Sequence, residues 1–124
     1  HKKADYASNT IERTYPRGMD TEVFSINALE TAYNKAGTNS EKEHVTPYLY
    51  TNPKQFNLIS ITDSPNFGNI RLTVDTEEDF ILIKKIIESL YPINKSFTYR
   101  DILNLLNKYK NWIKINNNVK QRGI

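Results

Sequence analysis

The chain contains no cysteine among its 124 residues. This absence excludes disulfide bonds, thiolate metal sites and cysteine nucleophiles. No apolar run approaches the roughly 18 residues that a membrane-spanning helix needs. The first ten residues, "HKKADYASNT", contain no apolar core of the kind found in secretory signals. We therefore expect a cytoplasmic protein that does not interact with membranes.

Familiar catalytic and phosphate-binding motifs are also missing. The sequence has no HExxH zinc motif, no GxSxG nucleophile turn, no P-loop and no GxGxxG loop. It consequently lacks any recognisable loop that could cradle a phosphate group.

The chain carries only a small excess of positive charge. The net charge is +3, and part of the positive charge is collected in the last segment, "NKYKNWIKINNNVKQRGI". A charged terminal segment is usually solvated, so we do not expect a nucleic-acid partner. Hydrophobic residues make up 38% of the chain, which is ordinary for a globular protein. We predict one domain over residues 1–116 and a basic tail over residues 117–124.

Hydrophobic periodicity indicates strands interleaved with helices. In "NIRLTVD", Ile70, Leu72 and Val74 alternate with polar residues, which is typical of a strand. The same reasoning predicts strands near residues 6–10, 22–25, 58–61 and 70–74, and helices near residues 28–35, 76–91 and 99–109. This order predicts an α/β or α+β domain.

The helical segments carry apolar stripes that we expect to face the core. Two stripes are predicted to be buried: Ile26, Leu29, Ala32 and Tyr33 in the first helix, and Phe80, Ile83, Ile86, Ile87 and Leu90 in the second. Trp112 and Ile113 are expected to hold the C-terminal segment against the body of the domain.

Polar residues predict where three helices begin. Thr76 with Asp79, and Thr98 with Asp101, have the spacing of helix N-caps. Ser40 with Glu43 has the spacing of a capping box. Pro47 would remove one internal hydrogen bond, so the helix after Ser40 is expected to be short or kinked.

Asp75 is an acidic residue at the junction between a predicted strand and a predicted helix. In α/β sheets, functional groups gather at the carboxyl ends of strands, and a carboxylate there suits Mg²⁺. A carboxylate near a helix N-terminus is also favoured by the helix dipole. From spacing alone, Asp75 is therefore either a helix cap or a metal ligand, and capping is the more common use.

Two other segments contain candidate binding residues. In "YPRGMDTEVF", Arg17 and Asp20 bracket a turn at Gly18, and Arg17 could bind a phosphate or a carboxylate. In "SEKEHVTPY", His44 beside Glu43 could act as a substrate donor or proton shuttle. The alternative in both cases is a set of solvated or structural side chains.

Taken in order, three segments resemble the C-terminal half of the spore coat polysaccharide cytidylyltransferases. They are "DYASNTIERTYPRGMDTEVFSINALETAY", "SEKEHVTPYLYTNPKQFNLISI" and "NIRLTVDTEEDFILIKKIIESLY", which share the ordered pattern "SNT…YP-G-D-EVF…E-EHVTPY…R-TVDT-ED". The wider group includes the 3-deoxy-manno-octulosonate and acylneuraminate cytidylyltransferases. The likeness spans residues 5–116.

The resemblance implies a fold and a reaction. The implied fold is α/β, the C-terminal portion of a Rossmann-like nucleotide-diphospho-sugar transferase. Its members transfer CMP from CTP to a sugar hydroxyl with release of pyrophosphate, and Mg²⁺ neutralises the triphosphate. By resemblance, Asp75 corresponds to a late metal-binding aspartate. The implied substrate-binding residues, for a sugar and CTP, are Arg17, Asp20, Glu43, His44 and Arg71.

The sequence also departs from this family. The family's first strand, its basic glycine-containing nucleotide loop and a further metal-binding aspartate are not found. We therefore expect a fragment that is inactive alone, with Asp75 as part of a divided Mg²⁺ site. The alternatives are a non-catalytic dimerisation module and a nucleic-acid-binding domain. We expect a homodimer, through family-like contacts, pairing of bare strand edges or swapping.

Overall fold

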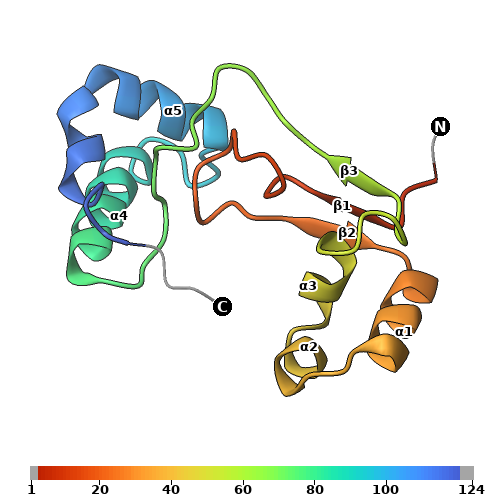
Figure 1. Cartoon of the computed structure of the whole chain (residues 1–124). Helices are drawn as coiled ribbons and strands as arrows, with labels where there is room; N and C mark the ends of the chain where they lie inside the picture. Colours follow the sequence, from red (N-terminus) through yellow and green to blue (C-terminus); the bar gives the residue numbers. More distant parts are fainter. Residues whose placement is uncertain (1–2, 121–124) are drawn as a thin grey trace. The chain divides into compact units, whose positions relative to one another are not determined.

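The computed structural model describes residues 3–120 as two compact units (Figure 1). The first unit comprises residues 3–15 and 20–66, and the second comprises residues 16–19 and 67–120. The predicted basic tail is therefore described only as far as residue 120. In chain order the elements are β1 (Tyr6–Ser8), β2 (Glu22–Phe24), α1 (Ile26–Lys35), α2 (Asn39–Glu43), α3 (Val45–Tyr50), β3 (Leu58–Ser60), α4 (Glu77–Leu90), α5 (Tyr99–Lys108) and the 3₁₀ helix η1 (Lys110–Ile115).

The first unit is built on a mixed three-stranded sheet in the order β2-β1-β3. The central strand β1 pairs antiparallel with β2, with Tyr6 opposite Phe24, and parallel with β3, with Tyr6 opposite Leu58. Tyr6 and Ser8, which alternate along β1, are both buried. Three of the four predicted strands are confirmed, each a residue or two shorter than expected.

Helices α1, α2 and α3 lie on the same side of these strands (Figure 1). The core of the unit contains Tyr6, Ala28, Ala32, Leu49 and Phe56. Ala28 and Ala32 face inward, and their small side chains allow α1 to pack closely. The predicted stripe on this helix is partly wrong, because Ile26 and Tyr33 are 73% and 61% exposed.

Helix α2 begins two residues earlier than the sequence suggests. Thr38, not Ser40, is the N-cap: its side chain accepts a hydrogen bond from the Glu41 N–H, and Glu41 accepts one from the Thr38 N–H. The two overlapping motifs share the same spacing, and Thr38 has the extended backbone that a cap requires. Pro47 lies in the first turn of α3, where its missing N–H is tolerated. The prediction of short helices here is confirmed.

The second unit packs α4, α5 and η1 around a core of Ile70, Leu82, Ile86 and Leu106. Trp112 and Ile113 pack against this cluster, as predicted. The caps are also as predicted. Thr76 accepts from the Asp79 N–H, and Thr98 and Asp101 form a complete capping box.

The rotation of α4 about its own axis differs from the prediction. Three members of the predicted stripe are confirmed, because Ile86 is buried and Ile83 and Leu90 pack against the core. The other two, Phe80 and Ile87, are 55% and 45% exposed, and Asp79 and Leu82 are buried instead. The reason is polar: the helix turns its Asp79 face inward, where Asp79 binds a buried arginine.

The predicted strand at residues 70–74 is wrong. The segment forms one isolated parallel bridge, between Arg17 and Arg71, through Arg17 N–H to Ile70 O and Leu72 N–H to Arg17 O. The partner segment turns at once at Gly18, whose φ is +103°, so the ladder stops there. A Cβ built on Gly18 would lie 2.0 Å from the carbonyl oxygen of Leu72, which only glycine avoids.

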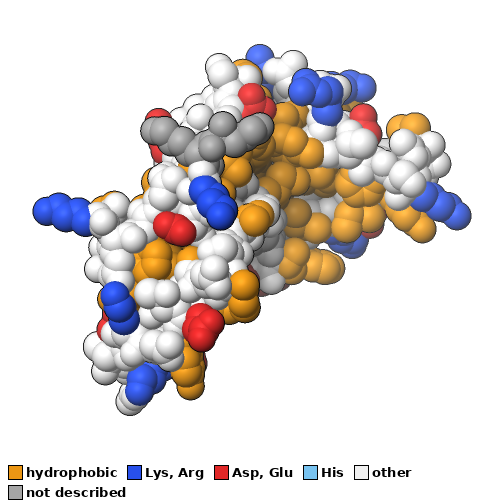
Figure 2. All heavy atoms as spheres, turned by 90° about the vertical axis from the view of Figure 1, so that its right-hand side faces the viewer, with side chains coloured by type: hydrophobic (Ala, Val, Ile, Leu, Met, Phe, Trp, Pro, Cys, Tyr) orange, Lys and Arg blue, Asp and Glu red, His pale blue; other side chains and the backbone are white. Residues whose placement is uncertain are grey.

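Large hydrophobic side chains are exposed in both units. On the face presented in Figure 2, hydrophobic side chains in orange are visible beside those of lysine and arginine. The most exposed large hydrophobic side chains include Val23 in the first unit, at 63%, and Ile93 in the second, at 84%. Within residues 3–120, no helix is both long enough and apolar enough to cross a bilayer.

Candidate functional site

A buried ion pair between Arg71 and Asp79 lies at the centre of the second unit. Arg71 Nε donates to Asp79 Oδ1 at 2.9 Å, and its Nη2 donates to Oδ2 at 3.0 Å. The Arg71 and Asp79 side chains are 6% and 0% exposed. Two parallel charge-assisted hydrogen bonds fix the plane of the guanidinium as well as its position.

Asp79 is held by more than this arginine. Its oxygens accept hydrogen bonds from Thr73 Oγ1 (2.8 Å), the Asp75 backbone N–H (3.0 Å) and Asn116 Nδ2 (2.7 Å). Burial acts to raise the pKa of Asp79, but the hydrogen bonds from Arg71, Asp75, Asn116 and Thr73 outweigh it and hold the pKa well below its usual range. The hydrogen bonds to Asp79, together with the negative charges of Asp79 and Asp75, raise the pKa of Arg71, although burial acts to lower it. The pair is therefore ionised at neutral pH.

Asp75 is positioned by this pair and projects outward. Its Oδ2 accepts from Arg71 Nη2 at 3.1 Å, and its side chain is 60% exposed. The helix cap is Thr76, the next residue, so the alternative that Asp75 caps α4 with its side chain is wrong. The sequence thus places an exposed carboxylate on a rigid, buried support.

The described residues do not complete a metal site. Between residues 3 and 120 there is no group of three or more histidine, aspartate or glutamate side chains placed to bind one ion. Both oxygens of Asp79 are occupied by hydrogen-bond donors, so of the two carboxylates bound to Arg71 only that of Asp75 is exposed. A single monodentate carboxylate is too few ligands for an all-protein Mg²⁺ site, although Mg²⁺ often retains waters and substrate oxygens.

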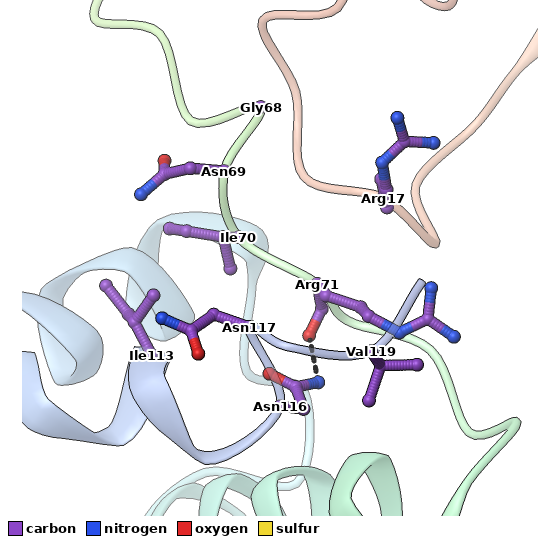
Figure 3. Close-up of a pocket in the computed structure, with 9 residues that line it drawn as sticks. All are labelled: Arg17, Gly68, Asn69, Ile70, Arg71, Ile113, Asn116, Asn117 and Val119. Atoms are coloured by element: carbon purple, nitrogen blue, oxygen red, sulfur yellow. Dashed lines mark hydrogen bonds between the residues drawn. The ribbon is translucent and has the colours of Figure 1, made fainter. Parts of the chain in front are cut away.

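Arg17 lies beside Arg71 and lines a shallow pocket of about 320 Å³ in the second unit (Figure 3). The other polar side chains around it belong to Asn69, Asn116 and Asn117. Arg17 is half-buried and forms no ion pair within the described residues. Asn116 Nδ2 donates to the Arg71 carbonyl oxygen, whereas its buried Oδ1 has no hydrogen-bond partner among residues 3–120.

The remaining predicted site residues belong to the first unit. Asp20 pairs with Arg13 through two hydrogen bonds of 2.8 and 3.1 Å, rather than with Arg17. Glu43 ends α2 and His44 links α2 to α3, and both are exposed. The structure thus brings together Arg17, Arg71 and Asp75 in one unit, and their proposed roles stay predictions.

Sequence reasoning missed three members of this network, Thr73, Asp79 and Asn116. Asp79 lies at the N3 position of a capped helix, and its part in the helix cap was a sufficient reason for an acidic residue there. The sequence therefore did not suggest that Asp79 also binds a buried arginine. The position of Asp79 four residues after Asp75 on an apolar helix face was the available signal. The sequence contains no comparable signal for Asn116, because Asn116 binds Asp79 from 37 residues further along the chain.

Comparisons with known proteins agree with this fold. No protein-family model matches the chain. An uncharacterized protein of Methanocaldococcus jannaschii, MJ1063, is 37% identical over 109 residues, which cover 86% of this chain and 44% of that protein. The solved structure of a cytidylyltransferase from Leptospira borgpetersenii is 28% identical, with a TM-score of 0.82, over 97% of this chain and 48% of that one.

The chain spans about half the length of these two proteins. The mixed sheet with helices is an α/β arrangement that fits a nucleotide-sugar transferase-like fold, which confirms the predicted fold class. The structural likeness also supports a nucleotidyltransferase-like kind of protein.

Proposed function

We propose that this chain is a portion of a cytidylyltransferase that activates a sugar by transferring CMP from CTP, in the synthesis of surface polysaccharide or another glycan. One observation carries the proposal: nearly the whole chain superimposes on part of a cytidylyltransferase at a TM-score of 0.82 and 28% identity. The resemblance to the spore coat polysaccharide enzymes supports the choice of a sugar as acceptor.

In this proposal Asp75 is a ligand of Mg²⁺ in the complete enzyme. Its support is the exposed carboxylate held in place by Arg71, which Asp79 in turn locks. Bound Mg²⁺ supplies charge neutralisation of the triphosphate. The other ligands and the nucleotide loop would come from protein outside this chain, since the described residues contain no complete set.

Arg17 is the strongest of the proposed substrate-binding residues. Its guanidinium has no ion-pair partner within the described residues, and Arg17 is one of the residues that line a pocket together with three asparagines (Figure 3). A guanidinium binds phosphate or carboxylate oxygens through paired hydrogen bonds. Asp20, Glu43 and His44 are proposed with less structural support. Asp20 is already paired with Arg13, and Glu43 and His44 lie exposed where α2 ends.

The test is an assay of pyrophosphate release with CTP, Mg²⁺ and a panel of sugars. A longer gene product that contains this segment should turn over, whereas the 124-residue chain should not. In the longer protein, Asp75→Asn should lower kcat at least about 100-fold if Asp75 binds the metal. Glu77→Gln removes an exposed carboxylate two residues away and should leave kcat within about twofold, because it touches none of the network.

Two results would contradict the proposal. Turnover by the 124-residue chain alone would remove the argument that half the enzyme is needed. Near-normal turnover by Asp75→Asn, with the fold intact by circular dichroism, would exclude the metal role of Asp75.

A further inference from the structure

The loop that follows β1 and the end of α3 form another pocket, whose lining residues all belong to the first unit. It is lined by Thr10, Ile11, Arg13 and Tyr50 and has a volume of about 380 Å³. This volume is within the range of small-molecule sites, roughly 300–1,000 Å³. None of the four residues was predicted to bind substrate, so the pocket is separate from the site built on Asp75.

Arg13 brings a positive charge to this pocket, and Asp20 neutralises it. Two hydrogen bonds of 2.8 and 3.1 Å join the guanidinium to the carboxylate. A guanidinium has five N–H donors, so three of those of Arg13 have no partner among residues 3–120. The pocket therefore offers hydrogen-bond donors without an uncompensated positive charge that would attract an anion.

Thr10 contributes a hydrogen-bond acceptor, as the contacts around it show. Ser8 Oγ donates its one proton to the Thr21 carbonyl oxygen at 2.9 Å. In the 2.8 Å contact between Ser8 Oγ and Thr10 Oγ1, Thr10 is therefore the donor. The lone pairs of Thr10 Oγ1 consequently remain to accept a hydrogen bond from a ligand.

Tyr50 contributes an aromatic ring and a hydroxyl group that can both donate and accept. Its ring contacts that of the buried Tyr6, with the two centroids 5.9 Å apart, and this contact holds the side chain in place. Within residues 3–120 the Tyr50 hydroxyl forms no hydrogen bond. Ile11, which is 44% exposed, adds an apolar surface to the same pocket.

We infer that this pocket binds the ring of an uncharged sugar, and that Thr10, Arg13 and Tyr50 recognise its hydroxyl groups. Each sugar hydroxyl is both a donor and an acceptor, and the pocket offers groups of both kinds. The C–H faces of a sugar ring are apolar, and Ile11 and the Tyr50 ring match them. A phosphate or a carboxylate is best bound by donors that carry a net positive charge, and Asp20 cancels that charge here.

The uncharged sugar is then the acceptor in the proposed reaction, so the inference rests on the proposed function and names the class of its substrate. Binding is measured on the 124-residue chain without CTP. A negative result therefore contradicts the sugar pocket and leaves the transfer reaction to its own assay. Conversely, a longer protein that releases no pyrophosphate would contradict the reaction and not the binding.

The first test is a titration of the 124-residue chain, followed through its amide NMR signals, with methyl glucoside, methyl mannoside and methyl galactoside as uncharged probes. At least one of them should bind with half-saturation between about 1 and about 50 mM and should shift the signals of residues 10–13 and of Tyr50. Glucuronate and inorganic phosphate are the anionic probes, and both should bind more weakly.

The second test removes one polar group. Tyr50→Phe keeps the ring and deletes the hydroxyl, so it should weaken binding of the best uncharged probe about three- to tenfold. Tyr33→Phe is the matched control: Tyr33 is 61% exposed on α1, and the same change there should leave binding unchanged.

The third test concerns charge. Asp20→Asn releases the positive charge of Arg13 and should reverse the preference, so that glucuronate binds more tightly than the uncharged probes. Far-UV circular dichroism confirms that each variant is folded.

Three outcomes would overturn the inference. One is the absence of specific shifts with all three methyl glycosides at the highest concentration of the series. Another is tighter binding of glucuronate or phosphate than of any uncharged probe by the natural chain. The third is an unchanged affinity in Tyr50→Phe or an unchanged preference in Asp20→Asn.

Discussion

At the residue scale, Asp79 is the charged group on which the second unit depends. Its carboxylate is fully buried and accepts hydrogen bonds from Arg71, Thr73, Asn116 and the Asp75 backbone. Asp79→Asn would leave the buried Arg71 guanidinium with the exposed Asp75 carboxylate as its remaining acidic partner. We expect the free energy of unfolding at pH 7 to fall by about 3–5 kcal/mol. Urea denaturation followed by circular dichroism measures it.

The effect of Asp79→Asn on stability should also depend on pH. The pKa of Asp79 is lower in the folded than in the unfolded chain, so its ionisation stabilises the fold above the unfolded pKa of about 4. This stabilisation is lost progressively as pH falls below about 4. The stability difference between the natural chain and Asp79→Asn should therefore shrink between about pH 4 and pH 2. A difference that stayed constant over this range would exclude Asp79 as the titrating group.

Gly18 is the residue whose backbone shape no other residue can supply. Its φ of +103° and its approach to the Leu72 carbonyl oxygen both exclude a Cβ. Gly18→Ala should lower the free energy of unfolding by more than about 1 kcal/mol. Gly37→Ala is the control, because nothing lies within 4 Å of a Cβ there and its φ is not positive. Gly37→Ala should be neutral or slightly stabilising. Thermal denaturation of both variants measures the two effects.

At the element scale, α4 separates what the sequence predicts from what it does not. The helix's limits, its Thr76 cap and its amphipathic nature follow from local pattern. The rotation of the helix does not follow from local pattern, because apolar residues occur on two of its faces and either face could pack against the core. The choice is made by Arg71 and Asn116, which bind Asp79 from outside the helix. Periodicity carries no information about such polar contacts.

This rotation can be measured by two substitutions. Leu82 is fully buried in α4, so Leu82→Ala should cost about 2–5 kcal/mol through lost burial and a cavity. Phe80→Ala removes a larger side chain that is 55% exposed, and should cost about 1 kcal/mol or less. Chemical denaturation gives both values. The reverse order would mean that the stripe predicted from the sequence is the buried one.

The segment at residues 70–74 shows a second limit of local pattern. Its alternation is typical of a strand, but a strand also needs a partner of matching length. The partner here turns away at Gly18 after one bridge. Side chains take over instead, since Arg71 and Thr73 hold the segment to Asp79. The site followed partly from sequence: Arg71 and Asp75 were expected, but their buried support was not.

At the scale of the whole molecule, residues 3–120 contain two separate hydrophobic clusters, one in each unit. Leu49 is fully buried in the first and Leu82 in the second. Leu49→Ala should therefore speed amide hydrogen exchange in α1, α3 and the sheet, and leave α4 and α5 protected. Leu82→Ala should do the reverse. Exchange measured by mass spectrometry would contradict this if either substitution exposed both units equally.

The four residues 16–19 stand in the sequence between β1 and β2 of the first unit, but they belong to the second. A gene segment that encodes residues 67–124 would therefore omit the stretch that pairs with Arg71. One that encodes residues 1–66 would carry that stretch away from its neighbours. A single cut in the gene therefore cannot separate the two units with each one whole.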